Sequence, residues 1–412
     1  MTDNDRYALI QLTVGARAEG GYLVRVTAGD RELEHDLDLP DELADLGAQL
    51  LKPNTIVPLD TPEAIGLKLG RALFSPEIRD LVLRYTRTAA AAGRRVQIRL
   101  QIADHELATL PWEWVALGGA RSWVPALRDD YALIRVGRGV SPPQPLPLDG
   151  PLRILAVGAP GELAQLDALE AALAETLQRG SIDLRLLSDA TAEALASALD
   201  EIDPAIVHLA APVLLTSEEE LEVRLNRPID AFALADMLRS REHLRLVTVC
   251  GSRGDGQLLS ATPGLLAALL LGERQPATLA VGGALTASAL AGAAASCYTL
   301  LAAGAPIDLA TTAGRRWLAD NGGAPVWGHL QVRALPDTGQ LFRPRRAAAT
   351  TPERLQRWVL PVVIAVVLVL LLLGGRLLSG RAAPSTPVPP PTVMVFTPQP
   401  IPTLAPAETK TP

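Results

Sequence analysis

The stretch "AIVHLAAP", residues 205–212, decides how this chain is interpreted. It has the length and the β-branched content of a buried strand, with Ile206 and Val207 near its start. One histidine, His208, lies inside the run, and Pro212, which can neither donate nor accept a proton, lies at its end. Chemistry in an open parallel sheet gathers at the carboxyl ends of strands. The order of these two residues is therefore the reverse of what a catalytic strand requires.

Apolar strands and amphipathic helices alternate around this stretch. Further strands are predicted at "LRILAVGA" (152–159), "IDLRLL" (182–187), "LRLVTVC" (244–250), "TLAVGGA" (278–284) and "HLQVRAL" (329–335). Helices are predicted at 162–180, 191–200, 231–241, 264–271 and 286–303. This alternation predicts an α/β fold with a mostly parallel central sheet and helices on both faces.

Residues 1–140 follow another pattern and are predicted to form a smaller α+β region. The segment "YALIQLTVGARAEGGYLVRVTA" (7–28) indicates two alternating strands around a Gly-Gly turn. Residues 63–92 are predicted to be mostly helical, and "RRVQIRLQIAD" (94–104) to be another strand. The proline-rich stretch "SPPQPLPLDGP" (141–151) is predicted to be a linker to a second domain at 152–340.

Composition excludes several classes of function. Of the 412 residues, 48% are hydrophobic, which is enough for a large core, and the net charge of -7 without a basic stripe argues against a nucleic-acid partner. The two cysteines, Cys250 and Cys297, and an amino terminus unlike a signal peptide predict no disulfide framework and a reducing cytoplasm. The five histidines are scattered, so we expect no metal site and no cofactor.

The segment "WVLPVVIAVVLVLLLLGG" (358–375) carries no charge and, extended to residue 378, is long enough to cross a bilayer. Thirteen Leu, Ile and Val residues within it contribute roughly -4 to -8 kcal/mol to insertion. The alternative, a buried core helix, would need a surrounding protein shell, and only a proline-rich segment follows. One transmembrane helix is therefore predicted at 358–378.

Charged flanks predict the orientation of this helix. The basic juxtamembrane linker 341–357 contains five arginines, namely Arg343, Arg345, Arg346, Arg354 and Arg357. On the other side of the charge-free segment 358–375 there are two nearby arginines, Arg376 and Arg381. The positive side stays in the cytoplasm. We therefore expect a single-pass protein of the cell membrane, with the lipid bilayer as a partner, its globular part cytoplasmic, and its Pro/Thr-rich disordered tail (379–412) extracytoplasmic.

Three sites could carry chemistry. Cys250 ends a predicted strand, where a nucleophile would be well placed, but it would need a base, and the alternative is a small buried apolar residue. The turn "GAPG" (158–161) could cradle a phosphate, although it lacks the three-glycine fingerprint and the P-loop lysine. Cys297 lies on an apolar helix and is expected in the core. The acidic segment "TSEEELEVRLNRP" (216–228) is predicted to be a solvated surface loop.

Several of these motifs together resemble a known family. "ELATLPWEWVAL" (106–117), "LRILAVGAP" (152–160), "AIVHLAAP" (205–212), "LVTVCGS" (246–252) and "SCYTLLAAGAPIDLATTAGRRWLA" (296–319) follow in the order found in CHAT-domain proteins, caspase-like cysteine peptidase homologues of bacteria and eukaryotes. Residues 69–102 also resemble the region that precedes this domain in many bacterial members. The resemblance covers most of residues 1–340 and implies a caspase-like sandwich.

The resemblance also implies site residues. In the family the third strand ends in a His-Gly pair, often as H-x-x-x-H-G, whose histidine is the general base, and the fourth strand ends in the nucleophilic cysteine. Cys250 matches the nucleophile and His208 the earlier, non-catalytic histidine, whereas Pro212 and Val213 stand at the His-Gly positions. His208 lies four residues, roughly 13 Å, from the base position, and proton transfer needs about 3 Å. His243 precedes the fourth strand, at the end opposite Cys250.

These observations favour a membrane-tethered CHAT-domain pseudo-peptidase that acts as a binding, scaffold or signalling module for an unidentified protein partner. Losing the general base costs about 10²–10⁴ in rate. One alternative is an active caspase-like cysteine endopeptidase that uses Cys250 with an unrecognised base. A second alternative is a nucleotide-sensing domain built on the 158–161 turn.

Overall fold

This computed structural model describes residues 7–17, 20–50, 57–58, 62–117, 123–137, 142–218, 220–250, 258–259, 261–272, 275–281, 283, 285–321 and 326–344. All of them fall within one compact unit, Met1–Arg346. The predicted membrane span at 358–378 and the tail at 379–412 lie outside the described residues. Among the helices that the structure describes, none combines the length and the apolar character needed to cross a membrane.

The strands are β1 (Tyr7–Ala16), β2 (Tyr22–Ala28), β3 (Arg31–Asp36), β4 (Val57–Pro58), β5 (Arg95–Ile102), β6 (Tyr131–Val136), β7 (Leu146–Leu148), β8 (Leu152–Gly158), β9 (Ile182–Leu187), β10 (Ile206–Ala210), β11 (Val213–Leu215), β12 (Leu221–Arg224), β13 (Pro228–Asp230), β14 (Leu246–Cys250), β15 (Leu258–Leu259), β16 (Ala277–Val281), β17 (Leu330–Ala334) and β18 (Phe342–Pro344). The helices are α1 (Asp41–Leu50), α2 (Pro62–Leu73), α3 (Pro76–Ala91), α4 (His105–Thr109), α5 (Leu163–Gln178), α6 (Ala192–Ile202), α7 (Ala231–Arg239), α8 (Thr262–Leu270), α9 (Ala287–Ala302) and α10 (Ile307–Asn321).

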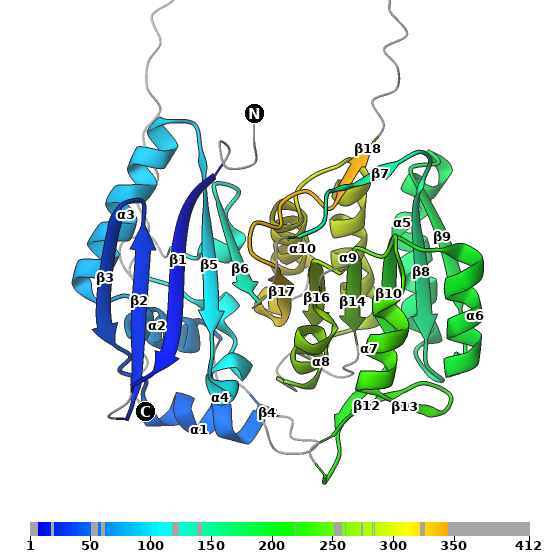
Figure 1. The fold of residues 1–412 in the computed structure, drawn as a ribbon, viewed down its shortest axis with the longest axis horizontal. Coiled ribbons are helices and arrows are strands. Elements are labelled where there is room, and N and C mark those ends of the chain that lie inside the picture. Colours follow the sequence, from blue (N-terminus) through cyan, green and yellow to red (C-terminus); the bar gives the residue numbers. More distant parts are fainter. Residues whose placement is uncertain are drawn as a thin grey trace, which may run out of the picture. The chain divides into compact units, whose positions relative to one another are not determined.

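One central sheet of eleven strands runs through the unit, in the order β3-β2-β1-β5-β6-β17-β16-β14-β10-β8-β9 (Figure 1). Most neighbouring strands are parallel; the antiparallel pairs of this sheet are β3 with β2, β2 with β1, and β17 with β16. The fold is therefore mixed α/β with a largely parallel central sheet, as the alternation of strands and helices predicted. The boundary at 141–151 stays a prediction, because the sheet continues from one side of it to the other.

Helices cover both faces of the sheet from β16 to β9. The apolar side chains of α5 and α9 join one core cluster, and those of α6, α7 and α8 join a second cluster on the opposite face. In β14, Leu246 and Cys250 belong to the first cluster, whereas Val247 and Val249 belong to the second. This split arises because successive side chains of a strand point to opposite faces of the sheet. Since helices cover both faces, β14 is apolar along most of its length.

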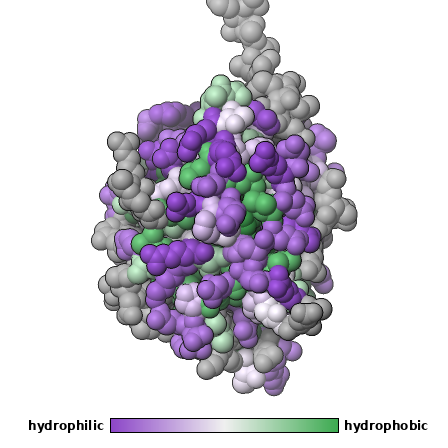
Figure 2. Space-filling model, turned by 90° about the vertical axis from the view of Figure 1, so that its left-hand side faces the viewer, coloured by the Kyte–Doolittle hydropathy of each residue, from purple (hydrophilic) through white to green (hydrophobic). Residues whose placement is uncertain are grey.

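The two edge strands of the sheet differ in their side chains. β3 reads "RELEHD" and has no fully buried residue, whereas β9 reads "IDLRLL" and mixes buried, half-buried and exposed residues. Viewed from the β3 side, the surface is mostly hydrophilic with small separate apolar areas (Figure 2). Charged side chains along an edge are a common protection against pairing with another chain.

The seam between β6 and β17 joins the two halves of the sheet. These parallel strands pair only at the last two residues of each, within the described part of the chain. Nearer their beginnings, the Arg315 guanidinium from α10 donates to the carbonyl oxygens of Leu133 in β6 and Leu330 in β17, at 3.1 and 2.9 Å. A buried side chain thus replaces ladder hydrogen bonds, which leaves both carbonyls satisfied where the strands diverge.

The segment after Pro212 departs from the prediction. Residues 216–228 were expected to form a solvated loop, but β11, β12 and β13 form an antiparallel three-stranded sheet there. The apolar residues Val213, Leu215 and Val223 are buried in this small sheet, whereas its acidic residues stay at least partly exposed. The expectation was wrong because the acidic residues of the segment hid the alternation of apolar residues that forms a half-buried hairpin.

Candidate active site

The candidate site lies at the carboxyl ends of β10 and β14. The two strands are parallel neighbours, and Ala210, the last residue of β10, is in register with Cys250, the last residue of β14. This confirms the predicted adjacency of the two strands. Beyond them, the Ala211 amide donates to the Cys250 carbonyl at 3.2 Å, and the Pro212 carbonyl accepts from the Arg224 amide at 2.9 Å. Pro212 is thus fixed at the start of the small sheet, beside the end of the cysteine strand.

Cys250 has a buried thiol with a raised pKa. The residue is 2% exposed, and burial is the main cause that raises the pKa of its thiol to about 12. The neighbouring Cys297 thiol and the Glu162 carboxylate raise the pKa further, whereas a hydrogen bond from Gln165 lowers it. At neutral pH the thiolate is roughly one part in 10⁵, against a few per cent for a free cysteine. Among the described residues, no cation lowers the pKa of this thiol.

His208 points to the same face of the sheet as Cys250, because residues 208 and 210 alternate together and Cys250 is in register with Ala210. Its Nδ1 lies 2.8 Å from the Tyr298 hydroxyl, which donates to Thr248 Oγ1 at 2.8 Å. Since the tyrosine proton goes to the threonine, the tyrosine oxygen accepts from His208 Nδ1–H. The imidazole is thereby held as one neutral tautomer.

Gln165 lies between the histidine and the cysteine. Its Nε2 is 3.4 Å from His208 Nε2, and its side chain also hydrogen-bonds the Cys250 thiol. An amide nitrogen can only donate, so His208 Nε2 accepts, which agrees with the neutral tautomer. Burial lowers the pKa of His208 to about 4. Both ring nitrogens are occupied, and the imidazole has no free lone pair with which to deprotonate the thiol.

The geometry refines the sequence argument about His208. Measured from Cys250 instead of Pro212, the histidine lies two register steps back, about 7 Å along the strands. This distance still exceeds the reach of direct proton transfer, and the Gln165 side chain lies between the two residues. Sequence reasoning missed Gln165. The sequence did contain a signal for it. Gln165 lies four residues before Leu169 and eight before Leu173, so it is a polar residue on the apolar face of α5.

The other predicted site residues lie apart from this network or serve the core. Cys297 is buried in α9, and burial raises the pKa of its thiol to about 12. His243 pairs with Asp203 at 2.6 Å before β14 begins, at the opposite end from Cys250. These positions agree with the predictions made for both residues.

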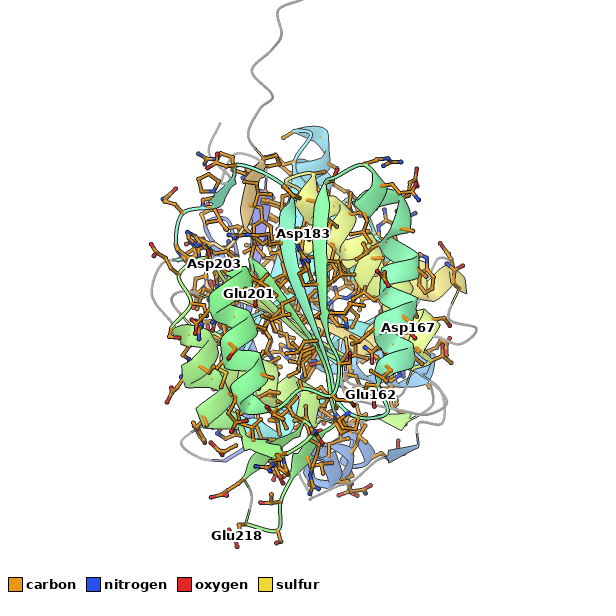
Figure 3. The ribbon with its side chains drawn as sticks, turned by 90° about the vertical axis from the view of Figure 1, so that its right-hand side faces the viewer. Glu162, Asp167, Asp183, Glu201, Asp203 and Glu218 are labelled. Carbon is orange, nitrogen blue, oxygen red and sulfur yellow. The ribbon has the colours of Figure 1, made fainter. Side chains whose placement is uncertain are left out.

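The turn at 158–161 does not have the chemistry of a phosphate site. Gly158 ends β8, and a Cβ there would lie 2.7 Å from Leu166 Cδ1, so this glycine serves close packing of α5 on the sheet. Glu162, 8% exposed, stands at the N-cap of α5 (Figure 3). A buried carboxylate at this position opposes an anion. Among the described residues, no group of three or more His, Cys, Asp or Glu side chains could hold a metal ion.

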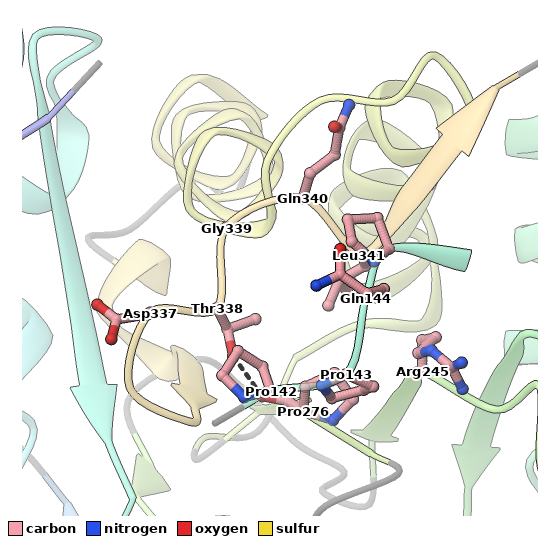
Figure 4. A pocket seen from close by; sticks show the side chains of 11 residues that line it. Pro142, Pro143, Gln144, Arg245, Pro276, Asp337, Thr338, Gly339, Gln340 and Leu341 are labelled. Atoms are coloured by element: carbon pink, nitrogen blue, oxygen red, sulfur yellow. Dashed lines mark hydrogen bonds between the residues drawn. The ribbon is translucent and has the colours of Figure 1, made fainter. Parts of the chain in front are cut away.

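A surface pocket of about 180 Å³ lies at the other end of the strands. Arg245, Pro276, Asp337 and Thr338 line it together with residues 142–145, and Thr338 Oγ1 donates to the Pro276 carbonyl at 3.3 Å (Figure 4). Arg245 immediately precedes β14, whereas Cys250 ends it. The pocket is thus separated from the cysteine by the length of a strand and does not belong to the candidate site.

A second buried polar cluster centres on Glu113, which stands between two tryptophans at residues 112–114. Arg135 Nε and Nη2 donate to both carboxylate oxygens at 2.8 and 2.6 Å, and Arg315 Nη2 lies 3.9 Å from Oε1. Burial alone would raise the pKa of Glu113, but these guanidinium groups outweigh it and hold the pKa below its usual range. Arg135 also donates to the carbonyls of Ala108 and Leu110. The "LPWEW" motif is therefore an anchor for the seam of the sheet.

No family model matches the chain, and no curated protein matches it. Among solved structures, two crystal structures of the Saccharomyces cerevisiae separase–securin complex are similar, with TM-scores of 0.43 and 0.41 at 9% and 8% sequence identity. Each match covers 80% of this chain and 30% of the matched chain. This chain thus spans less than a third of the length of the proteins it matches.

Proposed function

We propose that this chain is a caspase-like pseudo-peptidase of the CHAT-domain type, which acts by binding a protein partner rather than by cleaving one. The observation that carries the proposal is the pairing of a buried, protonated Cys250 with Pro212 at the position of the base. The largely parallel sheet and the adjacent ends of β10 and β14 support the caspase-like assignment. The sequence resemblance supplies the family.

Two independent losses support an inert site. A missing general base costs about 10²–10⁴ in rate. The thiol itself is about a thousandfold less ionised than a free cysteine at neutral pH, since burial raises its pKa to about 12. His208 does not compensate for either loss, because Tyr298 and Gln165 occupy both of its nitrogens. The same contacts make the site rigid, which suits a binding scaffold.

We further propose that the predicted helix at 358–378 tethers this scaffold to the cell membrane, with the globular unit in the cytoplasm. The charge-free span and the five arginines before it support this topology. Protease added to cells whose outer layers have been breached should trim the tail and leave the globular unit intact. Digestion of the globular unit under these conditions would show that the opposite orientation is correct.

Labelling by iodoacetamide at neutral pH tests the pseudo-enzyme proposal. Cys250 in the folded chain should react at least about 10³-fold more slowly than in the urea-unfolded chain. The matched control is Cys297, which has the same burial and the same direction of pKa shift, so Cys250→Ala and Cys297→Ala variants should label equally slowly. Selective, fast labelling of Cys250 together with peptide cleavage that Cys250→Ala lacks would support the active endopeptidase instead.

Restoring the base provides a second test. Pro212→His with Val213→Gly places the family pair next to the cysteine strand, but burial still keeps the thiol protonated. We expect little or no recovery of peptidase activity in this double variant. Strong recovery would show that the base alone had been lost and that the substrate site is intact.

A further inference from the structure

We propose that β9 is a docking edge for a second copy of this chain, which would extend the central sheet across a two-fold axis at Leu184. Within the described residues, β9 ends the sheet, and no strand pairs with its outer side. Figure 3, viewed from this side, shows the strands between helices α6 and α5, with Asp183 labelled at the edge. The proposal does not depend on the chemistry of Cys250.

The hydrogen-bond pattern decides which backbone groups are available. The Leu152 amide donates to the Ser181 carbonyl at 2.9 Å, and Leu152 is in register with Ile182. In a parallel ladder the odd residues of β9 therefore face β8, and the amides and carbonyls of Ile182, Leu184 and Leu186 face outward. A second strand can pair only through these three residues.

This constraint selects one symmetric register. Pairing Leu184 with Leu184 of the second copy, in antiparallel direction, makes Ile182 pair with Leu186 and lets all outward groups bond. The same register places Asp183 opposite Arg185 of the other copy, twice, at the close non-hydrogen-bonded positions where cross-strand charges interact. Moving the two-fold axis from Leu184 to Asp183 would place the two copies' Asp183 side chains opposite each other. Moving it to Arg185 would do the same for the two Arg185 side chains.

The side chains of β9 fit this arrangement. Leu186 is 38% exposed in the single chain and would be covered by its partner residue. Asp183 and Arg185, with side chains 38% and 64% exposed, lie 3.3 Å apart within one copy. In the pair of copies, the two Asp183 and two Arg185 side chains would form one cluster in which negative and positive charges alternate. An edge that carries opposite charges two residues apart is complementary to itself under a two-fold axis.

The opposite edge of the sheet is a natural contrast. In β3 the residues on one face are Glu32, Glu34 and Asp36, all of one sign. Any antiparallel self-pairing of β3 therefore brings carboxylates against carboxylates, which is destabilising. The two edges of one sheet thus differ: the β3 carboxylates already pair with Arg17 and Arg25 of the same copy and would meet like charges, whereas β9 would meet opposite charges.

Acidic residues around β9 set the conditions of the test. Figure 3 labels Glu162, Asp167, Glu201 and Asp203 on the elements next to the edge. Their repulsion between copies is long-ranged at low ionic strength and is largely screened at 0.15 M salt, where the Debye length is about 8 Å. Association of the copies is therefore tested at 150 mM salt.

Charge reversal at the edge tests the proposal on the full chain in non-ionic detergent, by light scattering and by energy transfer between labelled copies. Asp183→Arg alone and Arg185→Asp alone each create two like-charge contacts and should weaken self-association at least about tenfold. An equimolar mixture of the two variants restores both opposite-charge contacts and should associate within about threefold of the unmodified chain. Glu32→Arg on β3 is the control and should change nothing.

The mixing experiment separates the interface from effects on folding or on the membrane segment. A destabilised variant would not recover by meeting another destabilised variant. The proposal is overturned by a monomeric unmodified chain at 100 μM and 150 mM salt, by association that both reversals leave unchanged, or by reversed variants that fail to associate when mixed.

Discussion

The polar groups buried around Glu113 and those buried around His208 follow opposite electrostatic rules. The first cluster is charged, and a bidentate Arg135 and a nearby Arg315 balance the carboxylate. The second is neutral, and hydrogen bonds alone connect His208, Tyr298 and Thr248. A charge survives burial when opposite charge and fixed hydrogen bonds surround it, whereas a titratable group without them stays neutral.

The two clusters also differ in what surrounds their titratable groups. The Glu113 cluster holds the seam of the sheet, and its charges have no contact with a reacting group. In the cluster next to Cys250, no described residue supplies a positive charge that would favour the thiolate. The described side chains around His208 thus form a hydrogen-bonded polar network within the core.

Breaking the charged cluster should have the largest effect. Arg135→Met leaves Glu113 without its bidentate partner in a buried position and should lower the free energy of unfolding by about 3–5 kcal/mol. Urea unfolding followed by circular dichroism measures it. The control is Asp130→Asn, which breaks the half-exposed pair with Arg128 and should cost only about 0–1 kcal/mol. Similar losses in the two variants would contradict the anchoring role of Glu113.

Acid should destabilise the neutral cluster through His208. Its pKa is about 4 in the folded chain and about 6.5 in the unfolded chain, so between these values the unfolded state binds the proton and the folded state does not. Stability is therefore full above pH 6.5 and falls by about 3 kcal/mol as pH drops to 4.

The measurement is the free energy of unfolding at pH 7, 6, 5 and 4 for the unmodified chain and for His208→Gln, which keeps a hydrogen-bonding side chain but cannot titrate. The variant should lose this part of the acid dependence. His243→Gln, at an exposed histidine, should keep it. An unchanged acid slope in His208→Gln would show that the imidazole is not held neutral.

Removing the tyrosine hydroxyl should have a smaller effect. Tyr298→Phe leaves His208 Nδ1–H without an acceptor and Thr248 without its donor, and should cost about 1–3 kcal/mol. Thr248→Val is the matched comparison, because it leaves only the tyrosine proton unpaired and should cost less. Thermal unfolding measures both. A loss in Thr248→Val as large as that in Tyr298→Phe would contradict the role of the tyrosine hydroxyl as the link between both partners.

The smallest effect is expected at the cysteine itself. Cys250→Ala removes one buried sulfur and should cost about 1 kcal/mol at neutral pH. Burial raises the thiol pKa from about 9 to about 12, so the unfolded state loses its proton first and stability falls as pH rises above 9. At pH 10 this loss is about 1 kcal/mol, and Cys250→Ala should lack it. Comparison of unfolding at pH 8 and pH 10 measures the difference, with Cys297→Ala as the second buried thiol.

Much of the sheet could be predicted from the sequence. Apolar runs such as 152–159 and 244–250 needed no tertiary information, because a strand covered on both faces is continuously apolar. The neighbouring positions of Cys250 and Pro212 followed from the resemblance and agree with the register of β10 and β14. The strands β11, β12 and β13 were missed, since acidic residues masked a short alternating pattern.

The sequence by itself determined that Pro212 and Cys250 end two apolar strands, and the resemblance placed Pro212 where that family has its base. Only the tertiary structure decided what Gln165 and Glu113 do. Gln165 contacts His208, 43 residues later in the chain, and also Cys250, and Glu113 meets Arg315 across the seam of the sheet. Local patterns record burial and periodicity, but the partner of a buried polar atom depends on which distant segment arrives beside it, and no local pattern contains that information.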